Sequence, residues 1–285
     1  MKLSESRAYR RFRKNRGATV GAAIVATVVV LAILAPLLAP HDPDMPFKAR
    51  TLTTVGVPIG PDRTFPLGAD TVGRCELSRL LYGGRVSLSV AFAATALLAL
   101  IGTTVGIIAG YAGGRVDGAL MRGVDVLLAF PFLLVVMAIN RAVSRPGIWV
   151  LFLVLGLLSW AGPSRQVRAK VLQIRELEYV VAARALGATP LHIVLRHVLP
   201  NVLSLVIVLS TTLVAEMIIV ESVLSYLGVG VVAPTASWGS MLQESEALIR
   251  VAPRLTEIPM TAILVTVIGF NLLGEGLRDA FDPKA

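Results

Sequence analysis

Long runs of uncharged, apolar residues recur along this chain and limit the solvent in which it can fold. The first run, residues 19–39, contains no charged residue over 21 positions, and a helix needs about 20 residues to cross the hydrocarbon core of a bilayer. Of the 285 residues, 55% are apolar and 16% charged, against about 25% charged in a typical soluble chain. The sequence therefore predicts an all-α polytopic membrane protein and excludes a disordered chain.

Five further apolar runs follow, each bounded by Gly, Pro or charged residues. They cover residues 87–109, 119–139, 147–162, 202–227 and 258–274. Six transmembrane helices are the simplest interpretation. A cleaved signal peptide is the alternative for residues 19–39, but this run exceeds the usual apolar core of roughly 7 to 15 residues, and Pro40 fits poorly after a cleavage at Ala39.

The basic residues predict the orientation. The net charge of +9 would suit nucleic acid, but the Lys and Arg residues cluster at the ends of the apolar runs, where they act as topology signals in contact with lipid. Residues 1–17 alone hold seven of them. Both termini are therefore expected in the cytoplasm, and nucleic acid is not expected as a partner. The predicted parts are a basic segment (1–18), the first span (19–39), an extracytoplasmic loop (40–85), a core with five spans (86–275) and a cytoplasmic tail (276–285).

The extracytoplasmic loop contains one amphipathic stretch. Between Asp70 and Tyr82, apolar leucines alternate with Arg74, Glu76 and Arg79, which predicts a short helix on the outer membrane surface or packed against the bundle. Cys75 is the only cysteine. A disulfide scaffold is thereby excluded, and the thiol is expected to be a small apolar filler or a surface group.

Three glycines at intervals of four mark the second span. Gly102, Gly106 and Gly110 lie on one helical face, where the absence of side chains lets a neighbouring backbone approach closely. A phosphate-binding loop is the alternative, but no Gly-Lys-Ser/Thr sequence follows these glycines. The spacing therefore predicts helix packing.

Residues 163–201 form the longest predicted cytoplasmic stretch, and their pattern predicts two helices with a break. Residues 167–186 suit a helix, Gly187 suits the left-handed position that ends it, and Thr189 with Pro190 can begin the next helix. Pro200 is expected to end that second helix. A loop that only joins two spans could be much shorter, so this segment with its many small residues predicts a docking surface.

At these positions the sequence becomes recognisable. AARALGATPLHIVLRHVLPN resembles the cytoplasmic signature of permease subunits of ATP-binding-cassette importers, which reads Glu-Ala-Ala, three residues, Gly, nine residues, then an apolar residue, any residue and Leu-Pro. Val181 stands where Glu is usual, and His197 where Ile is common. Glu178, one turn away, could supply the carboxylate. The positions that match in spacing are Ala182, Ala183, Gly187, Leu199 and Pro200.

The resemblance extends over most of residues 65–283. FPLGADTVGRCELSRLLYGGRVSL, SVLSYLGVGVVAPTASWGSML and FNLLGEGLRDAFDP are similar to segments of the dipeptide, oligopeptide and nickel branch of these permeases. The resemblance implies the type I importer fold, with a second permease, two ATPase subunits that bind ATP and Mg²⁺, and an extracytoplasmic substrate-binding protein. It implies location in a bacterial inner membrane. In this interpretation residues 176–200 are a coupling helix, and the expected ATPase-coupling residues are Glu178, Val181, Ala182, Ala183, Arg184, Gly187, Ala188, His192, Leu199 and Pro200.

Three side chains outside this segment are further candidates. Glu216 and Glu221 lie within a span, where charge is costly and usually paired. Because they are five residues apart they point to different faces, and they could bind a substrate amine on the translocation path or pair structurally with the partner subunit. Trp238 is expected in an outer loop, as a receptor contact or as an anchor at the membrane interface.

Two other functions compete with an ATP-driven importer of peptides, nickel, glutathione or another small solute. An ion-coupled carrier would typically show internal repeats, and the two halves of this chain show none that is convincing. An intramembrane enzyme would need a catalytic motif such as His-Glu-x-x-His, which is absent. The chain has no Walker A motif either, so it is expected to be a non-catalytic subunit that binds no cofactor of its own.

Overall fold

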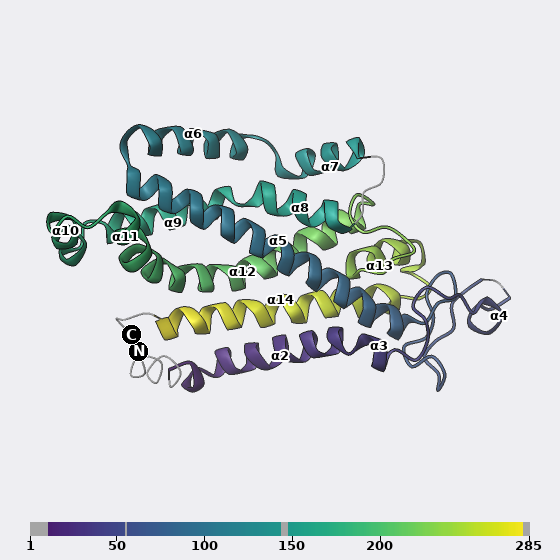
Figure 1. The fold of residues 1–285 in the computed structure, drawn as a ribbon. Helices are drawn as coiled ribbons and strands as arrows, with labels where there is room; N and C mark the ends of the chain where they lie inside the picture. The colour runs from purple at the N-terminus through teal and green to yellow at the C-terminus, as the bar shows by residue number, and fades with distance from the viewer. Residues whose placement is uncertain (1–10, 55, 144–147, 282–285) are drawn as a thin grey trace.

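The computed structural model describes residues 11–54, 56–143 and 148–281, and the regular elements within these ranges are helices (Figure 1). Two isolated β-bridges, Leu52 with Pro58 and Ala69 with Cys75, fasten the loop before the second long helix. The beginning of the predicted basic segment 1–18 and the end of the tail 276–285 lie outside the described residues. The predicted all-α class is confirmed for the described part of the chain.

Four helical segments are long and apolar enough to cross a membrane. They are α2 (Arg16–Ile33), α5 (Glu76–Ala112), the continuous stretch Pro190–Tyr226, and α14 (Arg254–Phe281). Helices suit these sequences because a helix satisfies its own backbone hydrogen bonds where no water is present.

Two bent pairs of helices raise the possible number of spans to six. Helices α6 (Gly114–Ala129) and α7 (Phe132–Ala142) meet at 81°, and α8 (Ile148–Ser159) and α9 (Ala161–Ile174) meet at 41°. The first break falls at Pro131, the N-cap of α7, and proline cannot continue a helix from the preceding turn. The count of six spans stays a prediction, since it requires each bent pair to cross once.

Helix α5 runs obliquely through the bundle, with α9 and α8 along one side and α12 (Leu199–Tyr226) on the other (Figure 1). Helix α14 packs between α12 and α2. Buried side chains of α5, α8 and α12 fill the main core, including Leu98, Leu155, Met217 and Ile218. Burial of Cys75, which is 0% exposed, confirms that this thiol is a small filler.

The two ends of the bundle differ in character. One end carries the start of α2, the end of α14 and the helical segment that connects α9 to α12. The other end carries loop 40–75 with α4 (Lys48–Thr51), and α13 (Trp238–Ser245) (Figure 1). Arg254 at the start of α14 holds the loop by donating hydrogen bonds to the carbonyls of Pro58, at 3.3 Å, and Ile59. The long loop is therefore tied to the helical core.

Three sequence predictions about helix boundaries are wrong. The stretch Asp70–Tyr82 is not a separate surface helix, because α5 begins at Glu76 and continues unbroken. At 37 residues and 1.5 Å per residue, α5 is roughly 55 Å long and extends beyond a hydrocarbon core of about 30 Å. The predicted helix 167–186 is two helices, α9 and α10 (Glu178–Ala185).

Pro200 does not end a helix as predicted, because it lies in the first turn of α12. The five residues Val194–Val198 before it form a π-helix, named η1. The wider turn accommodates a residue without an N–H group, and the Asn201 side-chain amide donates to the His197 carbonyl at 2.6 Å. Asn201 therefore satisfies a carbonyl inside a continuous helix and is not its N-cap.

Candidate functional site: a protruding helical hairpin

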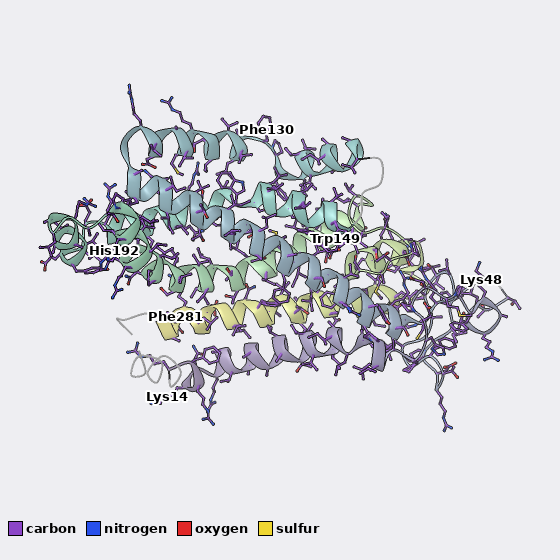
Figure 2. The ribbon with its side chains drawn as sticks, viewed as in Figure 1. Lys14, Lys48, Phe130, Trp149, His192 and Phe281 are labelled. Atoms are coloured by element: carbon purple, nitrogen blue, oxygen red, sulfur yellow. The ribbon has the colours of Figure 1, made fainter. Side chains whose placement is uncertain are left out.

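Helices α10 and α11 (Pro190–Ile193) form a hairpin at the end of the bundle where α2 begins and α14 ends. Figure 2 places His192 of this hairpin far from Lys48 of the loop at the other end, and toward the same end as Lys14 and Phe281. Residues Glu178–Val198, comprising α10, α11 and η1, are called the hairpin below.

The turn between α10 and α11 is fixed by backbone geometry. Gly187 has φ +83°, a conformation that costs a side-chain-bearing residue energy. The Ala188 N–H donates to the Ala183 carbonyl at 3.1 Å and the Gly187 N–H to the Arg184 carbonyl at 3.0 Å, which together form a Schellman motif. The predicted helix-ending role of Gly187 is confirmed.

The start of α11 also follows the sequence prediction. The Thr189 hydroxyl oxygen accepts a hydrogen bond from the His192 N–H at 3.4 Å, and Pro190 occupies the first turn. Both features are typical of a helix N-terminus.

One face of the hairpin is anchored to the bundle. Val180 is 0% exposed and Ile193 1% exposed, and both belong to a cluster with Val167 and Val171 of α9. The Arg184 guanidinium lies 5.9 Å from the centre of the Tyr111 ring at the end of α5, a favourable cation–π distance. The hairpin is therefore packed against α5 and α9.

The opposite face presents large apolar side chains to the outside. Leu186 is 88% exposed and Leu191 67% exposed, and Leu195, Val181 and Tyr179 are also exposed. Large apolar side chains that are exposed outside the membrane-spanning helices are typical of an interaction site. Among the predicted coupling residues, Ala183, Ala188 and Leu199 are half-buried, whereas Glu178, Val181, Ala182, Arg184, Gly187, His192 and Pro200 are exposed.

The three glycines of α5 lie against α9. A Cβ atom on Gly102 would come within 3.1 Å of the Trp160 carbonyl oxygen, and one on Gly106 within 2.7 Å of the Ser164 carbonyl oxygen. At Gly110 it would lie 2.8 Å from the Val171 side chain. Because these distances are below ordinary contact distances, α5 and α9 approach each other only where side chains are missing.

Charged side chains gather in a buried network at the other end of the molecule. Arg79 is 0% exposed and donates to Glu244 of α13 at 3.0 Å, and its Nε lies 3.3 Å from Asp70. Arg74 bonds Asp70 at 2.5 Å and also contacts Glu244. Burial raises the pKa of the Glu244 carboxyl, a shift that the charges of Arg79 and Arg74 oppose. The network joins the loop, α5 and α13. The sequence pattern had pointed to the charged residues Arg74 and Arg79, but it did not predict that they are buried.

Glu221 and Trp238 belong to one buried arrangement. The Glu221 carboxylate is fully buried and accepts hydrogen bonds from Ser87 of α5 at 2.8 Å and from Ser225 at 2.7 Å. Ser87 also accepts a hydrogen bond from the Trp238 backbone N–H. The Trp238 ring covers Gly84 and donates from Nε1 to the Leu80 carbonyl at 3.1 Å.

Trp238 therefore does not occupy the exposed position that its outer loop suggested. Only 3% of this residue is exposed. Glu216, in contrast, lies on an exposed face of α12. Asp125 forms an ion pair with Arg165 of α9. No three His, Cys, Asp or Glu side chains of residues 11–54, 56–143 and 148–281 lie close enough to hold a metal ion together.

The fold defines a multi-pass helical membrane protein with a helical hairpin that protrudes from one end of the bundle. Residues 102–285 match the family described as "Binding-protein-dependent transport system inner membrane component", and residues 6–53 match the "N-terminal TM domain of oligopeptide transport permease C". The chain belongs to this family of inner-membrane permeases, as the resemblance of the hairpin sequence predicted.

Curated relatives cover nearly the whole chain. A dipeptide transport system permease protein (DppC) of Bacillus subtilis is 39% identical over 279 residues, which is 97% of this chain and 85% of the relative. An oligopeptide transport system permease protein (OppC) of the same species is 37% identical over 96% of this chain and 88% of its own length. A putative peptide permease protein of Brucella ovis is 37% identical over 98% of this chain and 91% of its own. The chain is thus a multi-pass protein of the inner membrane.

Proposed function

We propose that this chain is one of two related permease subunits of an ATP-driven importer of di- or oligopeptides. The relatives named for dipeptide and oligopeptide transport cover almost the full chain, which supports the substrate class. In this proposal two separate ATPase subunits bind ATP and Mg²⁺, and a binding protein outside the cell delivers the peptide.

The observation that carries the proposal is the hairpin. An element with Leu186 and Leu191 exposed, at the end of the bundle where α2 begins and α14 ends (Figure 1), has the form of a docking surface for a soluble partner. We place this end in the cytoplasm, where the ATPases act. Six spans, with the termini inside and loop 40–85 outside, complete the proposed topology.

Coupling follows from how the hairpin is anchored. Val180 and Ile193 pack on α9 and α5, so a displacement of the hairpin would move these helices as a unit. Closure of the ATPases on ATP would thereby shift the bundle between inward-open and outward-open states. In this mechanism residues Glu178–Pro200 transmit the movement of the ATPases to the bundle. The glycines of α5 let α9 pack closely against it, so that the two helices move together.

Uptake by the reconstituted complex tests this function. The permeases and ATPases are placed in liposomes with the binding protein outside, and entry of radiolabelled dialanine is followed with and without ATP inside. We expect uptake only with ATP, and no effect of a proton ionophore. Uptake that continues without ATP and follows a proton gradient would identify an ion-coupled carrier instead.

A further inference from the structure

Glu216 is an exposed carboxylate near the middle of a membrane-spanning helix. It lies ten residues before the end of α12 at Tyr226, which places it about 15 Å along the helix axis from that end. Within the described part of the chain it has no hydrogen-bond or ion-pair partner. Because a charge facing lipid at this depth is costly, an exposed carboxylate here calls for water or a partner group in the assembled transporter.

Glu221, one turn further along α12, shows how this chain satisfies a carboxylate that belongs to its core. Hydroxyl groups of Ser87 and Ser225 donate to both oxygens of Glu221, and the residue is fully buried. Glu216 has no such surroundings. The contrast separates a structural carboxylate from one that remains available to a ligand.

Two grooves lie along α12 and α14, one before and one after Glu216 in the sequence of α12, and Glu216 lines neither of them. The outer groove has a volume of about 540 Å³ and is lined by Ile219 and Val223 of α12. The inner groove has a volume of about 600 Å³ and is lined by Ser204 and Thr212 of α12. Since residues three and four apart share a helical face, Glu216 lies on α12 between Thr212 of the inner groove and Ile219 of the outer groove.

The lining of these grooves favours a passing solute over a tightly packed helix. Each volume is in the range of small-molecule sites, roughly 300–1,000 Å³. The inner groove also carries Lys170, Glu275 and Arg278, charged groups that suit a water-filled path better than a membrane helix interface. Glu216 thus lies at a level of α12 between the two grooves.

We propose that Glu216 faces the translocation path and accepts the ammonium group of a passing peptide. This inference rests on the proposed peptide import and assigns a specificity role to one residue of it. A single carboxylate at this level of α12 binds weakly enough for release, as transport requires. The free α-amino group is the feature that all unmodified peptides share, so the contact does not depend on the peptide's side chains.

Solvent access tests the position of Glu216. In the assembled complex, Glu216→Cys is treated with a water-soluble cationic thiosulfonate, and the reaction is repeated with saturating binding protein and dialanine during ATP turnover. The natural Cys75 is buried, so the background is low. Ala26→Cys, exposed on the peripheral helix α2, is the control and should stay unreactive in lipid. We expect Glu216→Cys to react, and peptide to slow the reaction; an unreactive cysteine would show that the second permease or lipid covers this position and would overturn the proposal.

Transport rate tests the role of the charge. We expect Glu216→Gln to lower the maximal rate of dialanine uptake about tenfold, the equivalent of one lost charge-assisted hydrogen bond, and Glu216→Asp to restore part of it. Glu257→Gln, an exposed carboxylate outside both grooves, should transport normally. A normal rate for Glu216→Gln would refute the role. If the unaltered complex imports no peptide, the proposed function fails, whereas the thiol reaction still reports whether Glu216 lines a path.

Discussion

Gly106 is the position where α5 and α9 approach most closely, and its replacement gives a quantitative test of the packing. In Gly106→Ala the new Cβ atom would lie 2.7 Å from the Ser164 carbonyl oxygen and 2.7 Å from the Val167 side chain. Ordinary contacts begin at 3.4 Å, so α9 would have to move away by roughly 0.7 Å or more. The obstacle is backbone, which cannot rotate aside as a flexible side chain can.

The expected cost follows from that displacement. Overpacking a well-packed interface by one methyl group costs about 1–3 kcal/mol, and Gly106→Leu should cost more. The ordinary preference of a helix for Ala over Gly would act in the opposite direction, by about 1 kcal/mol. A net loss therefore means that close approach outweighs helix propensity at this position.

Thermal unfolding of the purified complex measures the effect. Gly118→Ala in α6 is the matched control, because a Cβ atom at Gly118 meets no atom within 4 Å, and it should be neutral or slightly stabilising. We expect Gly106→Ala to lower the melting temperature and Gly106→Leu to abolish recovery of the complex. Equal melting temperatures for Gly106→Ala and Gly118→Ala would refute the close-packing argument.

Three further substitutions test other parts of the structure. Trp238→Ala should destabilise the protein by about 3–5 kcal/mol because it empties a buried site, and the melting temperature should fall. A variant with unchanged stability but weaker receptor binding would instead assign Trp238 to the surface. Arg79→Met should destabilise the protein, by up to about 3–5 kcal/mol, because Arg74 would then be the one remaining partner of Asp70 and Glu244 in the network. It should also expose loop 40–75 to protease, whereas unchanged proteolysis would show that the network does not hold the loop. Gly187→Val should retain ATP hydrolysis but lose uptake, because a β-branched residue at positive φ costs about 1–3 kcal/mol and distorts the turn. Normal uptake by this variant would show that the turn geometry is not needed for transport.

The hairpin turn and the all-α class could be predicted because their signals are local. Gly187, Thr189 and Pro190 determine backbone geometry within a few residues of themselves, and the structure has the predicted turn. Apolar runs likewise indicate helices in lipid whatever their neighbours are.

The errors arose where the outcome depends on residues distant in the sequence. The charges of Arg74 and Arg79 suggest a surface helix, but their partner Glu244 is more than 160 residues away, and no local pattern reveals that they are buried. Trp238 was expected at a surface for the same reason, since Gly84, on which it packs, belongs to another helix. Pro200 is accommodated by the preceding π-helix, which has no simple sequence signal.

Crosslinking from the hairpin tests the central claim most directly. Leu186 is 88% exposed at the tip of α10, and Leu186→Cys can carry a short photoreactive group while the rest of the hairpin stays intact. In membranes containing the complete transporter, we predict that illumination joins this residue to a subunit that hydrolyses ATP, with a yield that changes when nucleotide binds. Crosslinks only to lipid, to the second permease or to the external binding protein would contradict the account.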